Sequence, residues 1–363
     1  MANNNRWVVG LFSLGAMTIA TACDEDGSDL NHGLSDEVAN DDHIDFTPVD
    51  EELTFRGAVE NGRELNGTAL NGKLFNGKLF NGKLFNGTAL GAAIERINGA
   101  RTAAVLHNAH PLTNIQLVNG SLMSAYDTVT AQTKLGEQLA GTTFNIDFDP
   151  MANGGENLVF KINSVSQSIL QNDVYFYNVE QLNELNVFET LCRDGAGNPT
   201  QAIALPGTWD PERATRQSGG TGKFTWACRG ASLAKAVEWG YRPWASAAMN
   251  DAHQATMRMI RADYCGDGVT HTSNGNPIDI SDKWNLQSPE TSWAIEAKWG
   301  PNGAVCLNTP RKLWWPRSSI PCAASLPYCT DNGLANGVVN TSPAQYGGLI
   351  MNQVVPNDTP SAY

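Results

Sequence analysis

The sequence MRMIRADYCGDG, from Met257 to Gly268, decides the fold of the C-terminal half of this chain. A run with helical spacing ends there at a cysteine that stands between an aromatic residue and two glycines. Small disulfide-stapled modules use such an arrangement where a helix turns into the next element. We therefore interpret the stretch as an architectural signature.

Two helices are expected around this signature. Apolar spacing predicts helices over 231–239, with Gly240 as the stop, and over 247–262. Nine of the ten tryptophans and five of the seven cysteines fall between Trp209 and Cys329. The segment 206–330 is therefore predicted to be a disulfide-stapled, Trp-rich module of helices and hairpins.

Two hairpins are predicted after Cys265. One is turned at Asn274-Gly275, and the other, SWAIEAKWGPNGAVCL, is turned at Pro301-Asn302. In the second hairpin, strand alternation would point Glu296 and Lys298 away from the face that carries Trp293, Ile295, Ala297 and Trp299.

The same residues resemble a known family. Ala262, Asp263, Tyr264 and Cys265 spell the name of the ADYC domain, and the segments 190–210, 224–244 and 295–311 are also similar to it. The resemblance spans about 136–330. It implies an exported bacterial protein, often a lipoprotein, and it implies no particular activity.

The first 22 residues are predicted to be a signal peptide. Arg6 precedes a mostly apolar run too short for an ordinary membrane span, and small residues end at Ala22, before Cys23. Lipoprotein processing requires a cysteine at this position, because its thiol carries the diacylglycerol. A general signal peptidase, the alternative, accepts the small residues whatever follows. We expect Cys23 to be lipidated and the protein to be anchored in the outer membrane of a Gram-negative cell envelope, although Asp24 is an inner-membrane signal in some bacteria.

The remaining cysteines form an even set, which suits disulfides in an exported chain. They are Cys192, Cys228, Cys265, Cys306, Cys322 and Cys329. Their pairing stays open, although Cys322 and Cys329 bracket a short loop and suggest a local disulfide.

The net charge of −13 is concentrated near the N-terminus. Twelve of the 37 acidic residues lie between Asp24 and Glu52, with no lysine or arginine among them. Such a segment cannot bury enough apolar surface to order itself, so 23–54 is predicted to be a solvated tether. The acidic balance argues against nucleic acid as a partner, since that needs a clustered basic face.

A five-residue repeat occupies 55–92, with NGKLF three times and related pentads on either side. Asn-Gly favours a recurrent corner, so the repeat indicates a narrow solenoid with one apolar position per pentad inside. It is too short for an independent solenoid. Docking on the following domain and a flexible stalk are the two alternatives, and we favour docking.

Strand-like segments dominate 93–205. The predicted strands cover 114–118, 141–148, 157–162, 174–179 and 186–191. Together the signals predict an α+β protein, with a β-rich N-terminal half that carries the repeat, then the stapled module, and a mobile tail over 331–363.

Few residues indicate a catalytic or metal-binding site. Asp267, Asp279 and Asp282 offer hard oxygen ligands and so raise a Ca²⁺ site as the one cofactor to consider, with turn stabilisation as the simpler interpretation. The HNAH sequence at His107 and His110 lacks a third ligand and is a weak metal motif. A Cys265–His271 pair is expected to be structural, because the cysteine belongs to a disulfide set. No catalytic residue is predicted.

Adjacent tryptophans suggest a binding surface. If Trp314 and Trp315 lie in a strand, they point to opposite faces, and one of them is then exposed to a glycan. Three hypotheses follow for function. The first is a non-enzymatic envelope structural or interaction protein, the second is a glycan or cell-wall binding module, and the third is an envelope hydrolase that uses Asp263, His271 and Glu296.

Overall fold

The computed structural model describes residues 58–61, 86–89, 100–148, 157–183, 185–193, 198–210, 215–217, 223–272, 276–289 and 291–354. The predicted signal peptide, Cys23, the acidic tether and most of the pentad repeat lie outside these residues. In the described part of the chain, β-strands predominate and there are two α-helices and three disulfides. The α+β fold class is thus confirmed in its β-rich character. No helix in these ranges has the length and apolar character that a membrane span requires.

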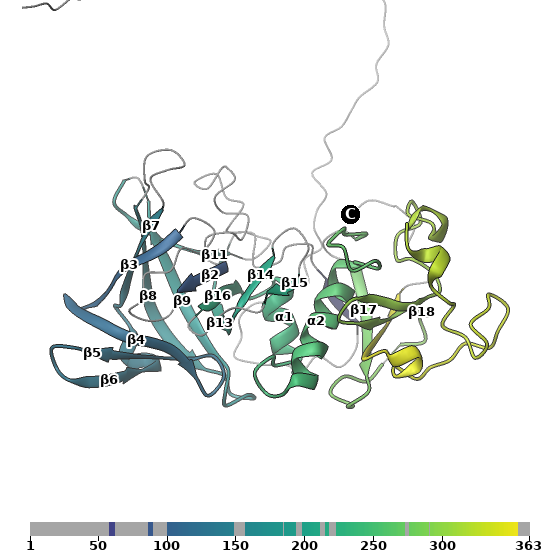
Figure 1. Ribbon diagram of the computed structural model, residues 1–363, viewed down its shortest axis with the longest axis horizontal. Coiled ribbons are helices and arrows are strands. Elements are labelled where there is room, and N and C mark those ends of the chain that lie inside the picture. The colour runs from purple at the N-terminus through teal and green to yellow at the C-terminus, as the bar shows by residue number, and fades with distance from the viewer. Residues whose placement is uncertain are drawn as a thin grey trace, which may run out of the picture. The chain divides into compact units, whose positions relative to one another are not determined.

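The largest sheet has eleven antiparallel strands (Figure 1). Its order is β2 (Asn86–Ala89), β16 (Lys223–Cys228), β13 (Ala202–Pro206), β9 (Tyr175–Leu182), β8 (Asn157–Gln167), β7 (Thr143–Phe148), β3 (Ala100–His107), β4 (His110–Val118), β5 (Leu122–Asp127) and β6 (Gln132–Leu135), with β10 (Phe188–Thr190) beside β9. The five strands predicted before residue 191 all lie within or overlap strands of this sheet. The sheet also includes β16, which comes from the segment predicted to start a separate module.

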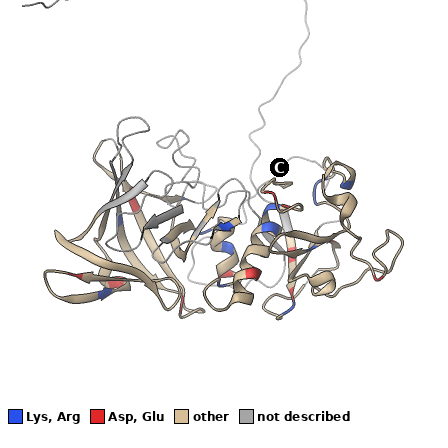
Figure 2. Ribbon diagram, viewed as in Figure 1, with Lys and Arg blue, Asp and Glu red and all other residues tan. Residues whose placement is uncertain are grey.

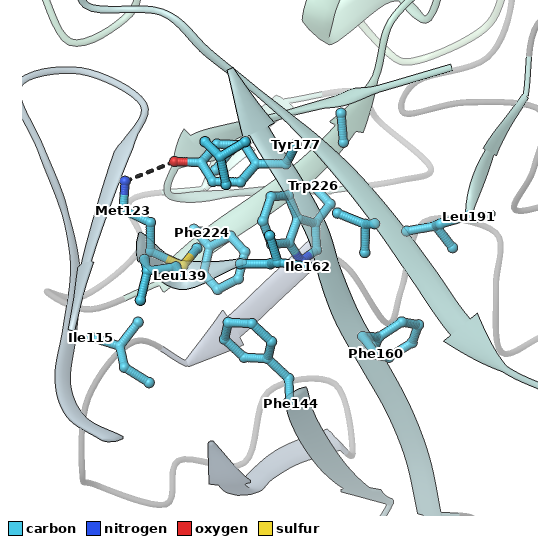
Figure 3. Close-up of a cluster of buried hydrophobic side chains, with 14 of the residues drawn as sticks. Ile115, Met123, Leu139, Phe144, Phe160, Ile162, Tyr177, Leu191, Phe224 and Trp226 are labelled. Atoms are coloured by element: carbon cyan, nitrogen blue, oxygen red, sulfur yellow. Dashed lines mark hydrogen bonds between the residues drawn. The ribbon is translucent and has the colours of Figure 1, made fainter. Parts of the chain in front are cut away.

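The sheet curls around an aromatic core, shown in Figure 3. Phe144 of β7 and Phe224 of β16 meet with ring centroids 6.5 Å apart, although three strands separate β7 from β16 in the sheet. Tyr177 packs edge-on against Trp226 at 5.1 Å, and its hydroxyl accepts a hydrogen bond of 2.8 Å from the Met123 N–H. One set of alternating residues on these strands therefore faces this interior, whereas Phe176, Ile203, Leu205 and Ala227 face the opposite side of the sheet, toward α1 (Ser232–Glu238).

A second sheet of five antiparallel strands forms the C-terminal part. Its order is β1 (Ala58–Asn61), β17 (Asn276–Asp282), β20 (Ile350–Val354), β18 (Ala294–Gly300) and β19 (Gly303–Leu307). The hairpin of β18 and β19 turns at Pro301-Asn302, as predicted. The other predicted hairpin is wrong: the described residues 269–272 form no strand, and β17 pairs with β1 and β20.

The two helices pack between these sheets (Figure 1). Helix α1 (Ser232–Glu238) covers the large sheet with Leu233 and Val237, and α2 (Ala247–Arg261) packs Met259 and Ile260 against the second sheet. Ser246 caps α2 by accepting a hydrogen bond from the Met249 N–H, as an N-terminal serine commonly does. Two short sheets complete the strands: β11 (Cys192–Arg193) with β12 (Pro199–Thr200), and β14 (Thr208–Asp210) with β15 (Thr215–Gln217).

The predicted mobile tail is wrong as far as Val354. Strand β20 is the central strand of its sheet, and Ile350, Met351 and Val354 are buried. The prediction failed because the polar, glycine-rich segment before β20 has the composition of a loop, whereas the strand itself is only five residues long.

The two described pieces of the N-terminal region add strands to the body. Strand β1 pairs with β17, and β2, which belongs to the last pentad, pairs with β16. These two short strands therefore contact the body of the protein, and docking of the whole repeat stays a prediction. The solenoid itself falls on residues that the structure does not describe.

Candidate functional site

The loop that follows α2 carries the sequence signature. Ala262 ends the helix in the left-handed conformation, with φ of 49°, and its N–H is donated to the carbonyls of Arg258 and Met259. A residue with a side chain in this conformation is strained, so the surrounding contacts must hold it. The β18–β19 turn is one of these contacts. It packs so closely on the loop that a Cβ atom at Gly266 would collide with the carbonyl oxygen of Asn302.

Asp263 is bound inside the protein by an arginine of α2. The Arg258 Nη1 donates to Asp263 Oδ2, and the Gly268 N–H donates to the same oxygen at 3.0 Å. The Arg258 Nη2 also donates to Thr215 Oγ1 at 2.9 Å, which links the signature to β15. Burial raises the pKa of Asp263, and the positive charge of Arg258 opposes this rise. The carboxylate thus closes the loop and joins it to the rest of the fold.

Tyr264 belongs to a second buried network. Its hydroxyl donates to Glu296 Oε1 at 2.7 Å, and Arg311 Nε donates to the same carboxylate at 2.9 Å. Asn352 of β20 donates to Glu296 Oε2 at 2.7 Å and accepts from Trp299 Nε1 at 2.7 Å. Burial is the main cause that raises the pKa of Tyr264 well above 10.0. Every residue of this network is buried, so its hydrogen bonds and charges are satisfied internally.

The alternation predicted for β18 is wrong at Glu296. A β-bulge between Ile295 and Ala297 turns Glu296 to the same side as Trp299, since both contact Asn352. Lys298 faces the opposite side and is also fully buried. Its ammonium donates to Gln345 Oε1 at 2.5 Å and to Asn340 Oδ1 at 3.3 Å, and burial lowers its pKa to about 8. Strand alternation predicted neither the bulge nor the distant loop that covers Lys298, because neither leaves a local signal in the sequence.

Three disulfides connect segments that are distant in the sequence. They are Cys192–Cys228, Cys265–Cys322 and Cys306–Cys329. The prediction of a local Cys322–Cys329 disulfide is therefore wrong, because Cys322 pairs with Cys265 and Cys329 pairs with Cys306. The 3-10 turn at Ala323–Ser325 brings Cys322 to the signature loop. The chain at Pro327 runs beside β19, where the Pro327 carbonyl accepts a hydrogen bond of 3.0 Å from the Leu307 N–H.

His271, the histidine of the candidate Cys265–His271 pair, packs inside the protein. Its Nδ1 lies 3.1 Å from the carbonyl oxygen of Ala262, and its ring packs 5.4 Å from Tyr264. Cys265, the other member of the candidate pair, is oxidised in the Cys265–Cys322 disulfide. The pair thus offers no thiolate.

A row of aromatic rings runs from this interior to the surface. Trp315 packs edge-on against His271 at 5.4 Å, and Trp314 lies 6.0 Å beyond it. The Lys312 ammonium lies 4.9 Å above the Trp314 ring, and Trp314 is 47% exposed. The two tryptophans occupy a turn, closed by the Trp315 N–H to Lys312 carbonyl hydrogen bond, and not the strand that was considered. We call Leu313, Trp314 and Trp315 the tryptophan turn.

The three candidate calcium ligands serve separate turns. Asp267 accepts from the Val269 N–H, Asp279 from the Thr291 N–H and hydroxyl, and Asp282 from three N–H groups that include Trp284 and Gln287. Among the described residues, no group of three His, Cys, Asp or Glu side chains is placed to hold a metal ion. Their contacts match the simpler interpretation as turn stabilisers.

Residues 136–313 match the family model of the ADYC domain. The chain carries an ADYC domain. Neither a curated protein nor a solved structure matches the chain. The matched range begins at the 3-10 helix Gly136–Leu139, which follows β6, and ends two residues after Arg311, so it includes both arginines that bind the carboxylates of the ADYC domain. It excludes β20, Cys322, Cys329 and the tryptophan turn from Trp314 onward.

Each letter of the ADYC motif now has a structural role. Ala262 ends α2, Asp263 pairs with Arg258, Tyr264 binds Glu296 and Cys265 forms a disulfide. Sequence reasoning identified the motif and missed Arg258, Arg311 and Asn352. An arginine five residues before Asp263 was the available signal, whereas Arg311 and Asn352 are too far along the chain to be connected to it by spacing.

Proposed function

We propose that this protein is an exported lipoprotein of the bacterial envelope, anchored through Cys23, whose ADYC domain is a non-enzymatic scaffold for interactions. The observation that carries the proposal is that the polar residues of the ADYC motif bind other residues inside the protein. Asp263 and Glu296 are both buried and each is paired with an arginine, at Arg258 and Arg311. A general acid or base must reach its substrate, and these carboxylates contact only the protein. The hydrolase alternative therefore receives no support from them.

The disulfides support export. All six cysteines after Cys23 are paired, and disulfides persist mainly in oxidising compartments outside the cytosol. Basic and acidic residues are interspersed along the described elements (Figure 2), which suits a protein partner or a glycan better than nucleic acid. The outer membrane is the proposed location.

Intact-mass spectrometry of the protein isolated from its native membrane tests this proposal. We expect a chain that starts at Cys23, carries a diacylglycerol thioether and contains no alkylatable thiol. A Cys23→Ser variant is expected to leave the membrane fraction and to keep its three disulfides. Free thiols throughout the native protein, or an unmodified Cys23, would contradict the proposal.

A glycan is the second candidate partner, favoured by the tryptophan turn. Trp314 offers a ring that is nearly half exposed, and Lys312 lies above it. Aromatic faces stack on the apolar faces of sugar rings, and the Trp314 ring packs on Trp315, which in turn packs on His271.

On a glycan array, the Trp314→Ala variant is expected to lose binding by about tenfold or more, since one stacked aromatic contributes roughly 1–3 kcal/mol. Val338→Ala is the matched control, because Val338 is an exposed apolar residue (72%) outside the tryptophan turn. Equal binding by the wild type and the Trp314 variant would rule out this surface.

A further inference from the structure

The hairpin of β3 and β4 carries two histidines at facing positions. His107 and His110 are paired in register and flank a two-residue turn in which Asn108 and Ala109 have φ of 51° and 64°. Residues that face each other across such a turn project from the same side of the hairpin, with Cβ atoms about 4.5–5.5 Å apart. The two imidazole rings are therefore neighbours.

His110 is oriented by a buried carboxylate. Its Nδ1 lies 3.1 Å from Asp127 Oδ2, and the Asp127 side chain is completely buried. The N–H groups of Val129 and Thr130 donate to the other oxygen, Asp127 Oδ1, at 2.9 Å and 3.0 Å. Oδ2 therefore faces His110 and accepts its Nδ1–H. The Nε2 lone pair then remains on a ring that is 36% exposed.

His107 has its proton on the same nitrogen. Its Nε2 lies 3.1 Å from the Nδ2 of Asn108, and an amide nitrogen can only donate, so Nε2 is the acceptor. The proton is then on Nδ1, which donates to Thr142 Oγ1 at 3.1 Å.

We propose that His107 and His110 form a binding site for a divalent transition metal ion such as Zn²⁺ or Cu²⁺. Metal-binding histidines commonly donate one ring N–H to a protein oxygen and bind the metal with the other nitrogen, which is the arrangement of both rings here. Asp127 and Thr142 are positioning residues. The Asn108 side chain must turn away from Nε2, and its amide oxygen is then available as a further ligand.

The site leaves room for an external ligand. Two imidazoles supply half of a tetrahedral coordination sphere, and the described residues bring no third His, Cys, Asp or Glu to it. Water or a partner's donor atom completes the sphere. Such an open arrangement is typical of metal ions that bridge to another molecule or stay exchangeable.

Calorimetric titration of the full chain with Zn²⁺ tests this inference, and Cu²⁺ electron paramagnetic resonance identifies the ligands. The wild type is expected to bind one equivalent, with coupling to two imidazole nitrogens in the copper spectrum. His110→Ala, which removes a partly exposed side chain, should abolish the site, and Asp127→Asn should weaken it about 10–100-fold. Near-ultraviolet circular dichroism checks that each variant is folded.

The acidic segment contains the competing histidines, His32 and His43. The double variant His32→Ala/His43→Ala is therefore the matched control, and it should keep the wild-type affinity and copper spectrum. No binding by the wild type, unchanged binding by His110→Ala, or loss of binding in the control variant would each overturn the inference.

Discussion

Removal of residues 349–363 is expected to unfold the second sheet. Strand β20 lies between β17 and β18, and it contributes the buried side chains of Ile350, Met351 and Val354. Truncating each of these to alanine would cost about 2–5 kcal/mol. Deleting the whole strand also removes its hydrogen bonds and the Asn352 contacts with Glu296 and Trp299. The combined loss is comparable with the entire stability of a domain, about 5–15 kcal/mol.

A shorter truncation after Val354 is the matched control, because it removes only residues 355–363 and leaves the sheet complete. Near-ultraviolet circular dichroism should lose the signal of Trp299 and its neighbours in the longer deletion and keep it in the control. Limited proteolysis should cut near β17 and β18 only in the longer deletion. A longer deletion that melts like the wild type would show that β20 is dispensable.

Replacement of Arg311 by methionine is expected to destabilise the protein by about 3–5 kcal/mol. Arg311 and Glu296 are both buried, so the variant leaves a carboxylate without its counter-charge in an interior where water cannot replace it. Two further hydrogen bonds, from the Arg311 guanidinium to the carbonyls of Met259 and Ile260, also disappear and leave the end of α2 unsupported. Chemical denaturation with urea measures the loss.

The matched control for this experiment is Lys161→Met. Lys161 pairs with Glu180 at 2.8 Å, but both side chains are about a quarter exposed, so we expect a loss below about 1 kcal/mol. The double variant Glu296→Gln/Arg311→Met should regain part of the stability, because it removes the buried charge. If Arg311→Met costs no more than Lys161→Met, the network does not hold the ADYC loop in place.

Sequence spacing predicted those parts of the fold that depend on neighbours along the chain. The helices α1 and α2 and the β18–β19 hairpin lie close to the expected bounds, and the five strands predicted before residue 191 overlap β4, β7, β8, β9 and β10, because each depends on a local apolar period or a turn. Strands β3, β5 and β6 were not predicted. The hairpin at Asn274-Gly275 had equally good turn residues and is absent, since β17 finds its partners in β1 and β20 instead.

The candidate site could be predicted only as a motif. The sequence identified Cys265 as a disulfide cysteine and Trp314 or Trp315 as an exposed aromatic, and both agree with the structure. The partners of Glu296 in the Tyr264 network could not be found. Arg311 and Asn352 lie 15 and 56 residues after Glu296, and no periodic pattern relates such positions.

By itself, the amino-acid sequence determined the ADYC loop: a helix end, an aspartate, a tyrosine and a cysteine whose order suits a stapled turn. Only the tertiary structure decided which cysteine meets Cys265 and what covers Glu296 and Lys298. The reason is physical. A disulfide and a buried charge are settled by contacts between distant segments, here Cys265 with a cysteine 57 residues away, and such contacts depend on how the sheets and helices pack.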